Sequence, residues 1–431
     1  MLALALLLLA APAADPAPQL SAAEMRMAAT VDREYERSVA LLQRLVDQNS
    51  GTTNLPGVAK VGEMMAAELR DLGFTVTWKP LPQTERAGHL IAVHAGRPGT
   101  RRLLLIGHLD TVFEADSPFQ RFVRKSEEAS GPGAGDDKGG MVVMLAALRA
   151  MRDAGTLDRT NIEIVLTGDE EDSGEPVALA RADLIAAGKR ADVALDFEGL
   201  AVEDGRDMGS IARRSANDWT LTVTGKSGHS SRIFSPAFGD GAINEAARIL
   251  AAFRTELPEP DLTFNTGVLA GGATAAIDPS GAKASAQGKS NIIPAQAIAS
   301  GDFRTLSEEQ TRRVRGKMEA IVARHLPGTD ARIAFKPGYP AMAPTAGNRA
   351  LLDRLNAVNR DLGLAEMPPL DPLKRGAGDI SWVAADVDGL VGLGTASRGD
   401  HTPDEVVDLS TIRRQGKRAA ILMSRLGVER R

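Results

Sequence analysis

Short apolar runs without alternation are the first pattern that the sequence offers. They stand at residues 103–106, 164–166 (preceded by Ile162 and Glu163) and 193–195, and stretches with helical spacing lie between them up to about residue 199. An unbroken apolar run of this length is typical of a strand buried on both faces of a parallel sheet. Strands that alternate with helices predict an α/β domain with a mostly parallel sheet.

The ends of the chain extend this helix-and-strand pattern. One long amphipathic helix is expected over residues 21–48, with Ser21 as its N-cap and Glu24 three residues later, as in a capping box. A second helix is expected over 58–72, followed by a strand that starts near residue 73. Near the other end, helices at 348–362 and 410–426 flank a strand at 390–393.

The pattern changes from about residue 206. Residues 219–224 alternate apolar and polar side chains, as a half-exposed antiparallel strand does. A helix at 241–253, further short strands and a helix at 308–324 follow. We therefore predict a small α+β domain over 206–326, inserted between two α/β segments at 20–205 and 327–431 that together form one domain.

Polar residues follow several of the predicted strands. In an open α/β sheet, ligands bind beyond the carboxyl ends of the strands. His and carboxylate side chains at those ends therefore predict one site assembled from separate segments, and they stand at His108, Asp110, Asp136, residues 169–172, Asp196, Glu198 and His401.

Composition narrows the chemistry. The chain has 431 residues, a net charge of -5 and no Cys. The negative charge gives no support to nucleic-acid or anionic-membrane binding. Without thiolates, a metal site has to use His and carboxylates, which suits Zn²⁺ and also Co²⁺ or Mn²⁺.

The first 14 residues form a short apolar stretch that ends in Ala11-Pro12-Ala13. This pattern predicts a signal peptide over 1–14, although it lacks the usual basic start, and hence a secreted or periplasmic protein. No later stretch is long enough for a membrane span.

The acidic run Asp169-Glu170-Glu171-Asp172 has two interpretations. In isolation, it reads as a solvated loop. At a strand end that faces a cleft, however, acids this close destabilise each other unless a cation intervenes. A pair of divalent ions would offset that repulsion and is a known catalytic device.

At these residues the chain resembles the dinuclear zinc exopeptidases and amidohydrolases that include glutamate carboxypeptidase of the carboxypeptidase G type, aminoacylase and succinyl-diaminopimelate desuccinylase. The resemblance extends from about residue 32 to 426 and rests on five motifs in the expected order. The carboxypeptidase G subgroup is the most similar, through residues 51–54 and 290–295. The five motifs lie at 107–112, 131–140, 169–171, 196–198 and 401–405.

The resemblance implies a role for each residue of the catalytic segments. Asp136 would bridge two Zn²⁺ ions, with His108 and Glu198 completing the ligands of one ion and Glu171 and His401 those of the other. Asp196 is the alternative ligand to Glu198. Glu170 would be the general base, and Asp110 would orient His108. A cis peptide bond between Asp136 and Asp137 is also implied.

The inserted segment would be the family's lid and dimerisation domain. His229 would reach the partner subunit's active site in a homodimer and stabilise the oxyanion. Arg304 would clamp the substrate's free carboxylate, the alternative being a surface ion pair with Asp302. Asn291 and Gly376 are further candidate substrate contacts, and Asp379 is either part of that Gly-rich turn or a helix N-cap.

The resulting expectation is a metallo-exopeptidase or amidohydrolase. It would cleave an amide bond next to a free-carboxylate amino acid in a small peptide or N-acyl amino acid. The alternatives are an aminopeptidase or dipeptidase with the same chemistry, and a metal-binding scaffold without activity. No residue selects a particular amino acid, and the alignment of Arg213-Arg214 is uncertain.

Overall fold

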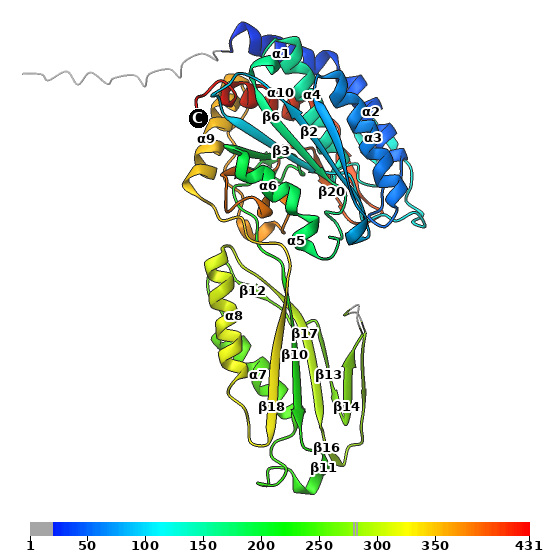
Figure 1. The fold of residues 1–431 in the computed structure, drawn as a ribbon, viewed down its shortest axis with the longest axis vertical. Helices are drawn as coiled ribbons and strands as arrows, with labels where there is room; N and C mark the ends of the chain where they lie inside the picture. Colours follow the sequence, from blue (N-terminus) through cyan, green and yellow to red (C-terminus); the bar gives the residue numbers. More distant parts are fainter. Residues whose placement is uncertain (1–19, 279–280, 282) are drawn as a thin grey trace, which may run out of the picture.

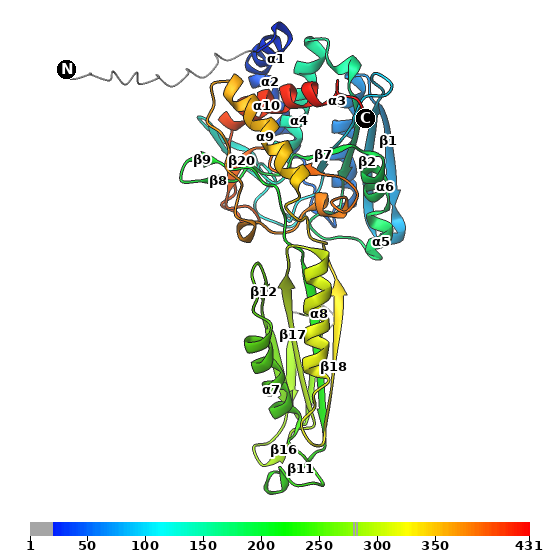
Figure 2. The ribbon, with the colours of Figure 1, turned by 90° about the vertical axis from the view of Figure 1, so that its left-hand side faces the viewer.

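The computed structural model describes residues 20–431 apart from 279, 280 and 282, so the expected signal peptide lies outside the described residues. Figures 1 and 2 show two parts: a globular α/β part, and an elongated inserted part that projects from it. The α/β part contains both ends of the described chain. Two connections, one leaving and one returning, join the two parts.

A six-stranded mixed sheet forms the centre of the α/β part, in the order β1-β2-β6-β3-β7-β19. Strands β6, β3, β7 and β19 are parallel, whereas β2 runs antiparallel to both β1 and β6. The expected mixed, mostly parallel α/β sheet is therefore confirmed. The strands are β1 (Thr75–Leu81), β2 (Arg86–His94), β3 (Arg102–His108), β6 (Asn161–Thr167), β7 (Val193–Asp196) and β19 (Gly389–Leu390).

Helices cover both faces of this sheet, which is why β3 has no polar face. Leu103 and Leu105 belong to the core on the side of α4 (Lys138–Asp153). Leu104 and Ile106 belong to the core that contains residues of α6 (Ala182–Arg190). The helices that pack around α4 are α1 (Ala22–Arg33), α2 (Tyr35–Asp47) and α10 (Ser410–Leu426). The other helices of this part are α3 (Leu55–Asp71), α5 (Val177–Ala180) and α9 (Ala346–Asp361).

The single helix expected over residues 21–48 is wrong in one respect. The chain forms two helices, α1 and α2, which meet at Glu34. The expected capping box is present, because the Ser21 hydroxyl accepts from the Glu24 amide and the Glu24 carboxylate accepts from the Ser21 amide. Both helices keep an apolar face against the core, so the sequence pattern continues across the break.

The inserted part has its own sheet and core. Its strands lie in the order β12-β17-β10-β18, and β13 also pairs with β17. Helices α7 (Ala242–Glu256) and α8 (Glu308–Val322) pack on this sheet around the buried Trp219 and Phe253. The strands are β10 (Asn217–Gly225), β12 (Thr263–Phe264), β13 (Val268–Gly272), β17 (Gln296–Arg304) and β18 (Thr329–Pro337).

The predicted limits of the inserted segment, 206 and 326, need correction. β18 pairs with β10 from residue 329 to 337, so the returning strand belongs to the inserted sheet. On the other side, Ser210 and Arg213 still form bridges with residues 391 and 342 of the α/β part. Residues 217–337 are therefore the segment that forms the inserted sheet.

Small sheets complete the structure. One of four strands consists of β4 (Val123–Lys125), β5 (Glu128–Ser130), β20 (Ala396–Arg398) and β21 (Val406–Asp408). Three two-stranded ribbons are β8 (Val202–Glu203) with β9 (Arg206–Asp207), β11 (Gly228–His229) with β16 (Ile292–Ile293), and β14 (Thr274–Ile277) with β15 (Ala284–Gln287). Among the described residues, no helix combines the length and apolar character that a membrane crossing requires.

Candidate active site

The candidate site lies at the carboxyl edge of the parallel strands. His108 is the last residue of β3, the central strand of the parallel group. Glu170 and Glu171 follow β6 on one side of β3, and Asp196 ends β7 on the other side. The strand order therefore brings together residues that are far apart in the sequence, at the edge where open α/β sheets bind ligands.

Asp136 lies at the centre of this group. Its Oδ1 is 3.0 Å from His108 Nε2, and its Oδ2 is 3.0 Å from His401 Nε2. His401 Nε2 is also 3.3 Å from a Glu171 oxygen. Burial acts to raise the pKa of Asp136, but the two histidines outweigh that effect and hold the pKa well below its usual range. Each carboxylate oxygen of Asp136 thus faces a different imidazole, as in a carboxylate that bridges two cations.

The donor set fits a metal ion. Ligand atoms of His108, Asp136 and Glu171 all lie within 4.8 Å of one another. Imidazole and carboxylate together suit zinc, cobalt or manganese. The expected cis peptide bond between Asp136 and Asp137 is present.

Asp196 and Glu198 supply two further carboxylates. Glu198 accepts from Arg213 Nη2 at 2.5 Å. Asp196 Oδ2 is buried with no hydrogen-bond partner in the described part of the chain. Burial and the neighbouring Glu198 charge raise the pKa of Asp196 to about 8. A buried carboxylate oxygen without a partner is a site where a cation would be stabilised, so both carboxylates remain candidates for the second ion.

Asp110 connects the histidine to the acidic loop. Its carboxylate accepts from the Glu170 amide at 3.1 Å, from the Glu171 amide at 3.1 Å and from the Thr52 hydroxyl at 2.7 Å. His108 Nδ1 lies 3.1 Å from the Asp110 carbonyl and 3.5 Å from its carboxylate. Asp110 therefore orients the His108 ring and holds the backbone of the loop that carries Glu170.

Glu170 faces a cavity of about 260 Å³. Burial, together with the charges of Glu198, Asp379 and Glu171, raises its pKa well above the usual range. A carboxylate with a raised pKa is a stronger base than an ordinary carboxylate, which suits a group that takes up a proton and later returns it. The residues that line this cavity are Asp136, Glu170, Glu171, Glu198, Arg213, Arg375, Gly376, Ala377, Asp400 and His401.

The run of four acids divides into two pairs. Glu170 and Glu171 face the cavity, but Asp169 and Asp172 do not line it. Asp169 is buried against Arg181, 2.5 Å away, and Asp172 pairs with Arg86 at 2.5 Å. The interpretation that the whole run requires a metal is therefore wrong, because two of the four charges have arginine partners.

The remaining predicted residues lie in three different places. His229 and Asn291 are at the far tip of the inserted part, around β11 and β16, and do not line the cavity of their own chain (Figure 1). Arg304 pairs with Asp302 at 3.3 Å, which is the alternative that the sequence left open. It also approaches the cavity, since a Cβ on Gly376 would be 3.6 Å from Arg304 Nη1. Gly376 lines the cavity.

Asp379 fits neither role expected for it. It is buried, 3.1 Å from Arg181 Nε, and accepts a hydrogen bond from Thr167. It does not line the cavity, and Gly378 occupies the N-cap of the short 3-10 turn that begins at Asp379. Its function is to help hold Arg181 behind the acidic loop.

The cavity also contains two arginines that no sequence motif marks as functional. Arg213 and Arg375 both line the cavity, and the Nε atom of each is buried without a hydrogen-bond partner in the described part of the chain. Arg375 directly precedes the Gly-rich turn at 376–378, so its position in the sequence was the available signal. No local pattern in the sequence connects Arg213 with Glu198.

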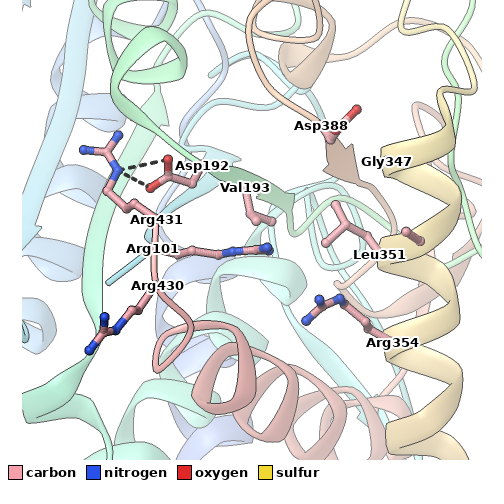
Figure 3. A pocket seen from close by; sticks show the side chains of 10 residues that line it. Arg101, Asp192, Val193, Gly347, Leu351, Arg354, Asp388, Arg430 and Arg431 are labelled. Carbon is pink, nitrogen blue, oxygen red and sulfur yellow. Dashed lines mark hydrogen bonds and ion pairs between the residues drawn. The ribbon is translucent and has the colours of Figure 1, made fainter. Parts of the chain in front are cut away.

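A second cavity, of about 370 Å³, lies at the opposite edge of the sheet, where β7 begins (Figure 3). Four arginines line it, but three of them pair with acids: Arg101 and Arg354 with Glu429, and Arg431 with Asp192. The lining has four arginines against two acids, Asp192 and Asp388, and no His. This cavity therefore lacks the excess of metal-type ligands that distinguishes the carboxyl edge.

Comparison with known proteins agrees with this geometry. The model of peptidase family M20/M25/M40 matches residues 104–424. The chain belongs to this family. It is 29% identical to carboxypeptidase G2 of Pseudomonas sp. (strain RS-16) over 405 residues, which cover 91% of this chain and 90% of that protein. It is 26% identical to a succinyl-diaminopimelate desuccinylase of Leptothrix cholodnii over 343 residues, 76% of this chain and 81% of that protein.

Solved structures share the fold. A tripeptidase from Staphylococcus aureus has a TM-score of 0.71 at 19% identity and covers 91% of this chain and 98% of its own. A dinuclear metal binding peptidase from Bacillus subtilis has a TM-score of 0.62 at 15% identity and covers 92% of this chain and 99% of its own. With the family shown, the chain is a metal-dependent hydrolase of amide or peptide bonds.

Lys138, beside the Asp136 loop, generates a prediction about pH. Its ammonium group is buried and donates to the Gln48 carbonyl at 3.0 Å, and burial lowers its pKa to about 7. Between this pKa and about 10.4, the unfolded chain binds a proton that the folded chain does not, so stability falls as pH is lowered through this window. We expect Lys138→Met to remove this dependence.

The measurement is the free energy of unfolding in denaturant between pH 7.5 and pH 9. The wild-type protein should lose about 1–2 kcal/mol more than the Met variant as pH is lowered across this range. Lys60→Met, at an exposed ion pair with Glu63, is the control and should retain the wild-type slope. Parallel curves for Lys138→Met and the wild-type protein would contradict the prediction.

Proposed function

We propose that this protein cleaves an amide or peptide bond next to an amino acid with a free carboxylate, as a carboxypeptidase or an N-acyl amino acid amidohydrolase. The observation that carries the proposal is the arrangement of Asp136 between His108 and His401, with Glu170 on the same cavity. Water activation and proton transfer both require charged groups on one cavity wall.

The proposed metal ligands are those that the family resemblance implies, and the close approach of His108, Asp136 and Glu171 supports the assignment. Asp136 would be shared, His108 and Glu198 would serve one ion, and Glu171 and His401 would serve the other. Two Zn²⁺ ions fit this set, with Co²⁺ or Mn²⁺ as alternatives. When bound, such ions lower the pKa of water and polarise a carbonyl group.

Glu170 is the proposed general base. Its raised pKa allows it to accept a proton from the attacking water and later to donate that proton to the leaving amine. Asp110 supports this role because it fixes the amides of Glu170 and Glu171. One residue thereby serves both proton transfers without changing its backbone position.

The free carboxylate of the substrate is assigned to Arg304. Its guanidinium lies beside Gly376, at the edge of the cavity, and offers parallel donors to a carboxylate. Arg213 and Arg375 add positive charge to the same wall. This distribution favours an anionic substrate such as a small peptide or an N-acyl amino acid.

His229 is the proposed oxyanion donor, acting on the partner subunit of a homodimer that forms through the inserted part. The exposed position of His229 at the far tip supports this assignment, because no residue there lines the cavity of its own chain. Asn291, whose carbonyl accepts from the Ser230 amide, would reach the partner's site with it. The apolar start at 1–14 supports export to the periplasm or the medium.

Glu170→Gln tests the general base. The amide cannot accept the proton, so kcat should fall by about 10²–10⁴-fold, while metal content stays at the wild-type level. Metal content is measured by mass spectrometry of the desalted protein. Asp172→Asn, in the same acidic run but paired with Arg86 outside the cavity, is the matched control and should retain activity. Near-normal turnover of Glu170→Gln would exclude this residue as the base.

A substrate panel tests the carboxylate requirement. N-acyl amino acids and dipeptides are supplied both as free acids and as C-terminal amides, with added zinc and with chelator. The free acids should be hydrolysed in a chelator-sensitive reaction, and the amides should not, because Arg304 would lose its anionic partner. Equal hydrolysis of the amides would instead favour an aminopeptidase or dipeptidase.

Mixing two inactive variants tests the exchange of His229 between subunits. His229→Ala alone should lower kcat by about 10²–10³-fold. After subunit exchange with Glu170→Gln, each mixed dimer would contain one complete site, so about a quarter of wild-type activity should return in an equal mixture. If activity does not return although mixed dimers form, His229 does not act across the interface.

A further inference from the structure

The inserted part is joined to the α/β part by two connections that pair with each other. Arg213 and Met342 exchange backbone hydrogen bonds of 3.0 and 2.9 Å. Closer to the inserted sheet, the Ala216 amide donates to the Tyr339 carbonyl at 2.9 Å. Ala216 immediately precedes β10, and Tyr339 follows the end of β18 by two residues. The two strands of this hinge therefore form one hydrogen-bonded ribbon.

Both strands of the ribbon contact the catalytic carboxylate loops directly. From one strand, Arg213 pairs with Glu198. From the other strand, the Tyr339 hydroxyl donates to the backbone carbonyl of Glu170 at 2.7 Å. In the described part of the chain, this is the only hydrogen bond that the Glu170 carbonyl accepts. The loop is held on its other side by Asp110, through the amides of Glu170 and Glu171.

The direction of the Tyr339 hydrogen bonds is fixed by its neighbours. Arg181 Nη2 lies 2.9 Å from the hydroxyl and can only donate, whereas the Glu170 carbonyl can only accept. Burial and the charge of Glu170 raise the pKa of Tyr339 well above its usual range, so the hydroxyl keeps its proton. The hydroxyl thus accepts from the guanidinium and donates to the carbonyl.

Arg181 is itself held firmly. It is fully buried, and it contacts the Asp169 carboxylate at 2.5 Å, the Asp169 carbonyl at 2.8 Å and Asp379 at 3.1 Å. The Tyr339 ring packs against Trp382 and lies 5.7 Å from the Arg181 guanidinium. Because Arg181 and Trp382 fix the Tyr339 side chain, its hydroxyl can hold the Glu170 carbonyl in one position.

We propose that Tyr339 is a positioning residue for Glu170, and that its hydroxyl couples the hinge of the inserted part to the loop that carries the general base. A rotation of the inserted part that displaces the ribbon displaces the Tyr339 hydroxyl, and with it the peptide plane of Glu170. The contribution to rate rests on the proposed role of Glu170, but the mechanical coupling does not.

Tyr339→Phe removes the hydroxyl and keeps the ring contacts with Trp382 and Arg181. We expect kcat to fall by about 10- to 100-fold, since small displacements of a catalytic group have effects of this size. KM and metal content should remain near the wild-type values. In hydrogen exchange measured by mass spectrometry, peptides covering residues 168–174 should exchange faster, because the carbonyl side of the loop is released.

The matched control is Tyr35→Phe, because the protein contains only two tyrosines. Tyr35 also donates a hydrogen bond, to Glu127 at 2.6 Å, but it lies in α2 and does not line the cavity. Tyr35→Phe should leave kcat and the hydrogen exchange of residues 168–174 unchanged. Tyr339→Leu removes the ring as well, so comparing it with Tyr339→Phe separates the contribution of the hydroxyl from that of ring packing.

The outcomes are distinct. If Tyr339→Phe matches Tyr35→Phe in both kcat and loop exchange, or if only Tyr339→Leu differs, the proposed coupling through the hydroxyl is overturned. Faster exchange of 168–174 in Tyr339→Phe, together with a fully active Glu170→Gln, would support the coupling and reject Glu170 as the base. Faster exchange with a lower kcat, and an inactive Glu170→Gln, would support both.

Discussion

Electrostatic compensation of buried carboxylates is the constraint on which this structure depends. The carboxyl edge of β3, β6 and β7 gathers more acidic side chains than a folded protein can hold without cations nearby. Arginines compensate those that do not need to react: Arg181 for Asp169, and Arg86 for Asp172. Asp136 instead faces two imidazoles, which are neutral metal ligands when deprotonated.

The pairing of some acids with arginines, while others stay on the cavity, explains why the α/β part has so many buried charged side chains. Arg181 and Lys138 are among the largest fully buried side chains of the described residues. Burying an unpaired charge is costly, so Arg181 is placed against Asp169 and Asp379, whereas burial lowers the pKa of Lys138 to about 7 and its amino group donates to the Gln48 carbonyl. The arrangement leaves Glu170, Glu171, Asp136 and Glu198 on the cavity wall, where the proposed metal and substrate sites lie.

The sequence placed the histidine and the acids of this sheet edge correctly because their signals are local. His108 ends an apolar strand, and Glu170 and Glu171 follow another, so strand position alone locates them. The partners that hold this edge are not local. Tyr339 lies 169 residues from Glu170 in the sequence, and Arg181 is an arginine without a recognisable pattern near a short helix. Only the folded arrangement connects them.

The same limit explains the mistaken end of the inserted segment, because β18 joins its sheet by pairing with β10, more than a hundred residues earlier.

The separation of the two cores has a consequence for catalysis. Each part is held by its own buried cluster, so the inserted part can change its orientation without loss of either core. The hinge ribbon that permits this motion is nevertheless in contact with Glu198 through Arg213 and with Glu170 through Tyr339. Arg304, at the end of β17 next to the same hinge, approaches Gly376 on the cavity wall. A change in domain orientation would therefore act on the loop that carries the proposed base, a candidate metal ligand and the proposed carboxylate clamp together, because all three are attached to a few residues on either side of one hinge.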